Sequence, residues 1–188
     1  MAIQNRTSKR PIVSKMFIII FSLVFILPIG LFGAFVGQCK IRQFGVKHSK
    51  QSQINSFQGA KLTSADTSSA NVYLGGDCVD SSPYVQVDKR VSTTKDAAET
   101  LTDIRQTLSS EKYTLSDEGI YKRVGIGSVA CGYRYGATAT GNGISFKLWF
   151  TTYDSQKLPQ ACGATGEVKV TESDLGSEPV NLLMARLN

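Results

Sequence analysis

Apolar residues are spread unevenly along the chain, and their pattern divides it into a tail, a span and a domain. Met16–Gly37 is a run of 22 residues without Asp, Glu, Lys, Arg or His. As a helix with a rise of about 1.5 Å per residue, this run would extend about 33 Å, enough to cross the hydrocarbon core of a bilayer. We therefore expect a basic tail over residues 1–15, a transmembrane helix over 16–37 and an extracytoplasmic domain over 71–188.

The segment between the span and the domain, residues 38–70, is mostly polar. From His48 to Ala70 it is rich in Ser, Gln, Lys and Thr and poor in large apolar residues. Such a composition buries too little surface to offset the entropy lost on ordering the chain. The sequence predicts a flexible juxtamembrane stalk here.

Within the domain, the clearest helical pattern begins near Thr93. Apolar residues lie on one stripe of a helix with 3.6 residues per turn; they are Ala97, Leu101, Ile104 and Leu108. Thr93 followed by Asp96 matches a variant of the capping box, and Ser109 and Ser110 mark the predicted end. We expect this helix to cover one face of a sheet.

A β-hairpin is predicted around Asn142-Gly143, a dipeptide that tolerates the positive φ angles of a type I′ turn. Apolar and polar residues alternate on both sides of it. A two-residue loop gives a register in which the apolar side chains of both strands share one face. The pairs in that register are Ala139 with Phe146, Ala137 with Leu148, and Tyr135 with Phe150.

Shorter alternating segments predict strands at Tyr84–Val91, Ile120–Ile126 and Glu167–Thr171. After Ser177, apolar residues recur at helical spacing, although their alternation is also compatible with a strand, and we expect a short helix. The order of elements indicates an α+β fold with a mainly antiparallel sheet packed by one main helix.

The net charge is +6, but its distribution argues against a nucleic-acid partner. All 15 acidic residues lie at or after Asp66, and residues 1–65 carry nine basic residues. From Asp66 onward, 12 Lys or Arg against 15 Asp or Glu give −3. The basic residues therefore flank the span, where Lys and Arg interact with anionic lipid headgroups.

A cleaved secretory signal is the alternative to a retained anchor, because basic residues precede the apolar run. Its cleavage site is poor, since a cut after Ala34 places the bulky Phe32 where a small residue is needed. Lys and Arg are balanced on the two sides of the span and do not set its orientation. The cysteines favour a cytoplasmic N-terminus and a domain outside the membrane, because disulfides persist in oxidising compartments.

Four cysteines follow the span or lie at its edge. Cys78, Cys131 and Cys162 are the candidates for one disulfide within the domain, and the sequence does not choose the pair. Cys39 lies at the membrane edge. Gly30, Gly33 and Gly37 share one face of the span in a GxxxG pattern, which would let two copies pack closely in a homodimer, with Cys39 as an intermolecular bridge.

No metal or other cofactor is expected. Zinc is disfavoured because there is no CxxC pair and the only histidine, His48, lies outside the domain. The acidic cluster of Glu172, Asp174 and Glu178 lacks the spacing of an EF-hand loop, so we interpret it as a polar loop.

An enzyme is not the expected class, and no catalytic residue is assigned. A domain without histidine excludes Ser-His-Asp and Cys-His arrangements. Two carboxylate pairs, Asp77 with Asp80 and Asp117 with Glu118, could in principle supply the acid and base of a glycan hydrolase. That activity is an alternative to a binding role.

The polar side of the predicted hairpin carries Arg134, Lys147, Trp149 and Tyr153. Trp, Tyr and Arg are enriched at protein interfaces. The sequence therefore predicts a membrane-anchored binding module of the cell envelope, with an envelope protein or glycan as partner. If the C-terminal segment covered Trp149, the residue would instead belong to the core.

A pilin-like assembly subunit is a further alternative. Type IV pilins resemble this chain in outline, because they also join an N-terminal apolar helix to an α+β head. Their apolar helix carries a glutamate, whereas Met16–Gly37 has none. This difference ranks the pilin-like interpretation below an anchored binding module.

Overall fold

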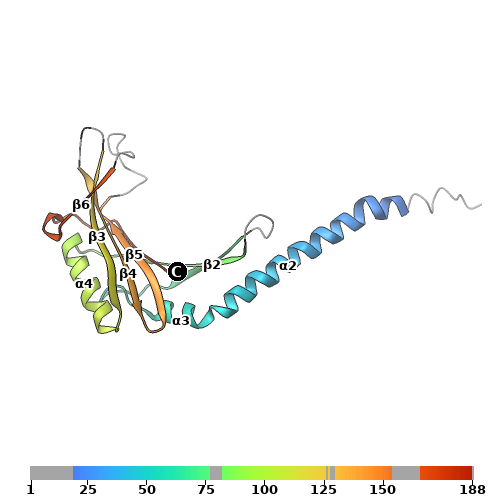
Figure 1. Ribbon diagram of the computed structural model, residues 1–188, viewed down its shortest axis with the longest axis horizontal. Coiled ribbons are helices and arrows are strands. Elements are labelled where there is room, and N and C mark those ends of the chain that lie inside the picture. The colour runs from blue at the N-terminus through green and yellow to red at the C-terminus, as the bar shows by residue number, and fades with distance from the viewer. Residues whose placement is uncertain (1–18, 77–81, 126, 128–129, 154–165, 188) are drawn as a thin grey trace, which may run out of the picture.

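The computed structural model describes residues 19–76, 82–125, 127, 130–153 and 166–187. A seven-stranded sheet with helices on one face forms the domain, and a long N-terminal helix projects from it (Figure 1). This architecture confirms the α+β class. The basic tail over residues 1–15 lies outside the described residues.

All neighbouring strands of the sheet are antiparallel. Their order is β1-β2-β7-β5-β4-β3-β6, so the last strand of the chain lies between β2 and β5. The strands are β1 (Ala70–Gly75), β2 (Tyr84–Val91), β3 (Thr114–Val124), β4 (Ala130–Gly141), β5 (Ile144–Thr151), β6 (Gly166–Val170) and β7 (Leu182–Leu187). The predicted strands before the main helix, after it and near residue 167 are therefore confirmed as β2, part of β3 and β6.

The hairpin of β4 and β5 has the predicted register. Asn142 and Gly143 form its turn with φ angles of 50° and 75°, which both residue types tolerate. Phe146, Leu148 and Phe150 lie opposite Ala139, Ala137 and Tyr135 and are at most 1% exposed. The small side chains of β4 leave room for the large ones of β5 beneath the helices.

The expected C-terminal helix is wrong, because residues Leu182–Leu187 form strand β7. Leu183 and Ala185 are buried on the core face, and Met184 and Arg186 belong to the other face. Of the two patterns that the sequence allows here, the alternation with a period of two describes the observed structure, and the helical spacing does not. Hydrogen bonding to β2 on one side and β5 on the other stabilises this strand beyond its local propensity.

Helix α4 (Ala97–Ser110) is the predicted main helix, and Leu101, Ile104 and Leu108 on its inner stripe are fully buried. It begins later than the sequence predicts. Asp96 is the N-cap, and its carboxylate accepts a hydrogen bond from the backbone N–H of Glu99 at 2.8 Å. Thr93 instead accepts from the backbone N–H of Lys95 in the approach to the helix.

The predicted flexible stalk over residues 38–70 is wrong. Helix α2 (Leu27–Ser49) continues far beyond the apolar run, and α3 (Gln51–Gly59) follows almost directly. Ile54 and Phe57 of α3 are 1% and 0% exposed and belong to the core of the domain. The prediction relied on the average composition of the segment. A short helix can dock on the sheet through only two apolar residues on one side, as Ile54 and Phe57 do.

The N-terminal helical segment Ile19–Ser49 is long and apolar enough to cross a membrane, by length and composition. Within it, η1 (Ser22–Ile26) is a π-helical stretch just before Pro28, a residue without a backbone N–H. Ile29 and Phe32 are each 70% exposed. The described part of the domain does not cover these side chains. A short 3-10 helix, η4 (Glu172–Asp174), precedes β7.

Candidate binding face of the sheet

The two faces of the sheet differ in what covers them. Helices α3 and α4 pack on one face, where Phe57 and Leu101 join the core cluster with Phe146 (Figure 1). Among the described residues, no helix lies over the centre of the other face, which we call the open face. Within the described residues, one broad surface of the sheet is therefore not packed against a helix.

Charged side chains on the open face are mainly basic. Directly paired residues of neighbouring strands point to the same side, so the registers assign each side chain to a face. Six cations and two carboxylates of the described strands share the open face: Arg90, Arg123, Arg134, Lys147, Lys169, Arg186, Asp88 and Glu167. This excess of positive charge contrasts with the −3 of the chain from Asp66 onward.

Trp149 lies half-buried near the centre of the open face, with Met184 as its neighbour on β7. The guanidinium carbon of Arg186 lies 5.7 Å from the centroid of the indole ring. The C-terminal strand therefore lies beside Trp149 in the sheet and does not cover it, as a core role would require. Trp149 is therefore partly exposed to solvent on this face.

Arg186 is fixed over Trp149 by two hydrogen bonds to one carboxylate. Its Nε and Nη2 donate to Oδ1 and Oδ2 of Asp88 at 2.7 and 2.9 Å. These bonds from Arg186 outweigh the effect of burial and hold the pKa of Asp88 below its usual value. Lys147 lies opposite Arg186 in the register and is exposed. Two cations thus face outward side by side, which a negatively charged partner would stabilise.

A second arginine is held in the same way on β4. Arg134 donates through Nε and Nη2 to the two carboxylate oxygens of Glu167, at 3.0 and 2.6 Å. Its guanidinium also stacks over the ring of Tyr121, with 5.0 Å to the centroid. The planar groups are therefore pre-organised, so a partner would lose little side-chain entropy on binding them.

Of the four binding residues predicted from the sequence, Arg134, Lys147 and Trp149 lie on the open face. Tyr153 joins them at one end, because its hydroxyl accepts a hydrogen bond from Nη1 of Arg123 at 3.2 Å. The sequence analysis missed Arg186, Asp88 and Arg90. They lie on β7 and β2, and a C-terminal helix would not have placed Arg186 beside β5.

The carboxylate pair Asp117 and Glu118 is poorly suited to general acid catalysis. Glu118 accepts hydrogen bonds from Nη2 of Arg105 at 2.8 Å and from the buried hydroxyl of Tyr135 at 2.9 Å. The bond from Arg105 is the main reason that the pKa of Glu118 is lowered, whereas a general acid needs a raised one. The other pair, Asp77 and Asp80, lies outside the described residues.

The described residues contain no group of three His, Cys, Asp or Glu side chains that could hold a metal ion. The acidic cluster near the C-terminus is divided among separate partners. Glu172 pairs with Arg105, Asp174 accepts from the backbone N–H of Thr171, and Glu178 accepts from the hydroxyl of Thr152.

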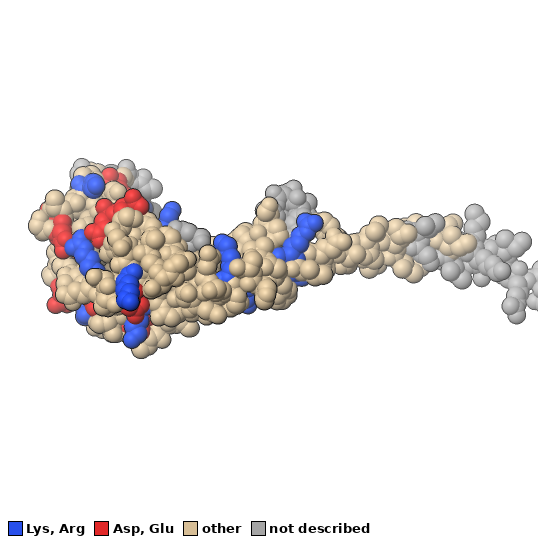
Figure 2. All heavy atoms as spheres, turned by 60° about the horizontal axis from the view of Figure 1, so that its bottom comes forward, with Lys and Arg blue, Asp and Glu red and all other residues tan. Residues whose placement is uncertain are grey.

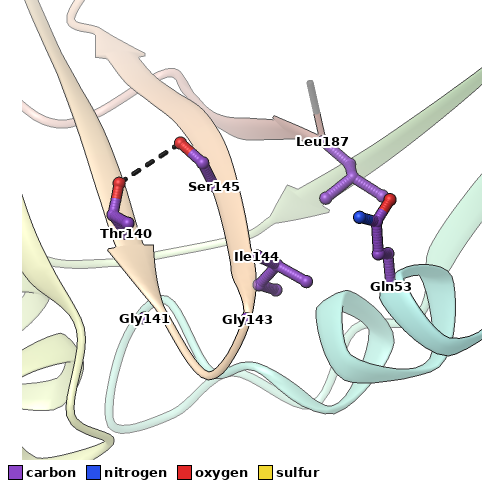
Figure 3. Close-up of a pocket in the computed structure, with 7 residues that line it drawn as sticks. All are labelled: Gln53, Thr140, Gly141, Gly143, Ile144, Ser145 and Leu187. Atoms are coloured by element: carbon purple, nitrogen blue, oxygen red, sulfur yellow. Dashed lines mark hydrogen bonds between the residues drawn. The ribbon is translucent and has the colours of Figure 1, made fainter.

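A surface hollow of about 410 Å³ lies between α3, the turn of the β4–β5 hairpin and the end of β7 (Figure 3). Gln53 and Leu187 form one side, and Ile144 lies across from them. The hydroxyls of Thr140 and Ser145, also in its lining, hydrogen bond to each other at 3.2 Å. With no titratable side chain in the lining, this hollow offers little chemistry.

The cysteine and glycine predictions are tested only in part. Neither Cys39 nor Cys131 is a free thiol, and Cys78 and Cys162 lie outside the described residues, so the pairing stays a prediction. The sulfur of Cys39 lies 4.0 Å from the carbonyl oxygen of Gly76 in its own chain. No atom of the described chain approaches a Cβ built on Gly30, Gly33 or Gly37. Dimerisation through that face also stays a prediction.

No protein family matches the sequence, and no curated protein or solved structure is significantly similar to it.

Proposed function

We propose that the protein is a single-pass membrane-anchored interaction module that binds an acidic segment of an envelope protein through the open face. The observation that carries this proposal is the pairing of Trp149 with Arg186 on a sheet face that no helix of the described residues covers. Aromatic and arginine side chains are the commonest energetic centres of protein interfaces. The excess of cations on this face selects an acidic partner.

The anchor part of the proposal is supported by the helix Ile19–Ser49. Its length and hydropathy suit a span, and its apolar side chains are exposed, as they would be toward lipid. We place the N-terminus in the cytoplasm and the domain outside, where Cys39 and Cys131 can be held in disulfides. A retained anchor predicts that the full-length chain resists alkaline extraction from membranes. Recovery of a shortened, soluble chain would instead support a cleaved signal.

The binding part can be tested by site-specific photocross-linking in the native host. A photoreactive residue is placed at Lys147 on the open face or, as the matched control, at Gln106 on the exposed side of α4. We expect an adduct from position 147 and none from position 106. The adduct is to be analysed by mass spectrometry, which also distinguishes a protein partner from an acidic glycan.

Charge reversal then tests the electrostatic complementarity. Lys169→Glu changes an exposed cation of the open face without removing an aromatic contact. We expect it to reduce the adduct formed at position 147, because a rim charge steers association with an acidic partner. An undiminished adduct, or equal cross-linking from both faces, would contradict an acidic partner on the open face.

A further inference from the structure

We infer that the end of the β1–β2 hairpin rests in the headgroup layer of the bilayer and fixes the orientation of the domain. This inference depends on the proposed transmembrane anchor, and it adds a second lipid-contacting surface formed by the folded domain. The contact surface, here called the exit collar, consists of exposed apolar and aromatic side chains: Ile41, Phe44, Tyr73, Leu74 and Tyr84.

The hairpin is bound directly to the anchor helix. Gln43 of α2, 6% exposed, donates from Nε2 to the carbonyl oxygens of Gly75 and Gly76 at 3.4 and 2.9 Å. Cys39, one turn earlier, lies against Gly76 and is 9% exposed. These contacts hold the helix against the end of β1. Figure 1 shows the β1–β2 end projecting from the sheet toward α2.

The depth of this contact follows from the helix geometry. The uncharged run ends at Gly37, and Lys40 is the first charged residue after it. At about 1.5 Å per residue, Cys39 and Gln43 lie about 3 and 9 Å beyond Gly37 along the helix. Each headgroup layer is about 5–7 Å thick outside the hydrocarbon core. Cys39 thus lies within the headgroup layer and Gln43 just outside it, so the hairpin end, which contacts both residues, meets the outer part of the headgroups.

The side chains at this level suit a bilayer interface better than water. Ile41 and Phe44 are 72% and 61% exposed, and Tyr73 and Tyr84 are each 52% exposed. Tyrosine is enriched at membrane interfaces, where its ring enters the apolar boundary and its hydroxyl stays hydrated. A Cβ at Gly75 would overlap the Tyr84 ring, so the ring lies across β1 and presents a broad apolar surface.

The charges of the helix exit also match a lipid surface. Lys40, Arg42, Lys47 and Lys50 surround this end of the helix, and no acidic residue precedes Asp66. Figure 2 shows blue side chains and no red ones where the described part of the helix leaves the domain. Anionic phospholipids attract such a cluster, which favours them over zwitterionic lipids as neighbours of the exit collar.

The test uses the full chain, reconstituted in vesicles of phosphatidylcholine and phosphatidylglycerol with and without brominated acyl chains. Bromine quenches only tryptophans close to it. Each variant carries Trp149→Phe and one new tryptophan. The reporter is Tyr73→Trp, and the matched control is Val168→Trp, which is 53% exposed on β6 at the opposite edge of the sheet. With about 4.8 Å between strands, the two edges lie about 29 Å apart. Phe32→Trp reports insertion of the span.

We expect brominated lipid to quench the tryptophans at positions 32 and 73 and to leave the one at 168 unchanged. Quenching at 32 without quenching at 73 would overturn the hairpin contact while preserving the anchor. A blue-shifted emission at 73 that brominated lipid does not quench would overturn it in favour of a second copy on the exit collar. Absence of quenching at 32 would overturn the anchor itself, and the inference with it.

Discussion

Nζ of Lys89 lies 3.1 Å from Oδ2 of Asp66, and the two side chains are 2% and 0% exposed. Lys89 is on the core face of β2, and Asp66 belongs to the segment that follows α3. Nζ also donates to the carbonyl oxygen of Ala60, and Oδ2 accepts from the backbone N–H of Leu62 at 2.9 Å. Both charges are thus satisfied, and they hold residues 60–66 against the sheet.

Removing one member of this pair should be strongly destabilising. Asp66→Ala leaves the Lys89 ammonium buried without its counter-ion, which typically costs about 3–5 kcal/mol. Urea unfolding of the full chain in detergent micelles, followed by circular dichroism, measures this change. The matched control is Glu172→Gln, which breaks a surface pair whose glutamate is 48% exposed and should cost less than about 1 kcal/mol. Equal costs would contradict a buried pair.

Stability should fall at acidic pH, and Asp66 should contribute to the fall. Burial raises the pKa of Asp66, but hydrogen bonds from Leu62, Ser68 and Lys89 together lower it below its usual value. A carboxylate with a lowered folded-state pKa stabilises the fold above its unfolded pKa of about 3.9, and this contribution is lost as the pH falls through the folded-state pKa. The unfolding free energy should therefore drop below about pH 4.

Asp66→Ala should make this pH dependence less steep. It should not abolish it, because the pKa of Asp88 and of Glu118 is also lowered, chiefly by hydrogen bonds from Arg186 and Arg105. Midpoints of urea unfolding at several pH values provide the comparison. Identical acid profiles for the two chains would show that Asp66 does not titrate with folding.

The parts of the fold that the sequence predicts well are those whose local pattern and tertiary setting agree. The hairpin is one, because the Asn142-Gly143 turn and the apolar alternation require the same register. Leu182–Leu187 is ambiguous between two periodicities, and only the pairing with β2 and β5 resolves it. The residues of the open face are likewise predictable only where the local sequence pattern agrees with the strand pairing. Arg134, Lys147 and Trp149 come from the predicted hairpin, whereas Arg186 and Asp88 depend on that unpredicted strand pairing.

Phe57 distinguishes an ordered α3 from a flexible stalk. Its ring packs edge-on against Phe146 with 5.1 Å between centroids and is fully buried. Phe57→Ala should cost about 3–5 kcal/mol in the unfolding free energy, as expected for a core phenylalanine. Phe44→Ala, at a position 61% exposed on α2, is the control and should leave the urea midpoint nearly unchanged. A flexible stalk would make both substitutions neutral.

Asp96, rather than Thr93, should be the energetically important cap of α4. Asp96→Ala removes the acceptor for the Glu99 N–H and should cost about 1 kcal/mol, the usual value for an N-cap. Thr93→Ala should cost less, because its hydroxyl accepts only from Lys95 in the turn before the helix. Thermal unfolding of the two variants ranks them. A larger loss of stability for Thr93→Ala than for Asp96→Ala would support Thr93 as the cap, as the sequence predicts.

Trp149 is the only tryptophan, so its fluorescence reports on the open face alone. Arg186→Ala removes the cation above the indole ring and leaves Asp88, 8% exposed, without its two charged hydrogen bonds. We expect stronger acrylamide quenching of Trp149 and a loss of about 1–3 kcal/mol in stability.

Lys147→Ala is the control for this experiment, because Lys147 is an exposed cation of the open face that lies directly opposite Arg186 in the register of β5 and β7. It should change neither quenching nor stability appreciably. If both variants altered the quenching equally, a general change of surface charge would explain it. A selective effect of Arg186→Ala would instead show that the Arg186 guanidinium covers the indole of Trp149, the arrangement on which the proposed binding face depends.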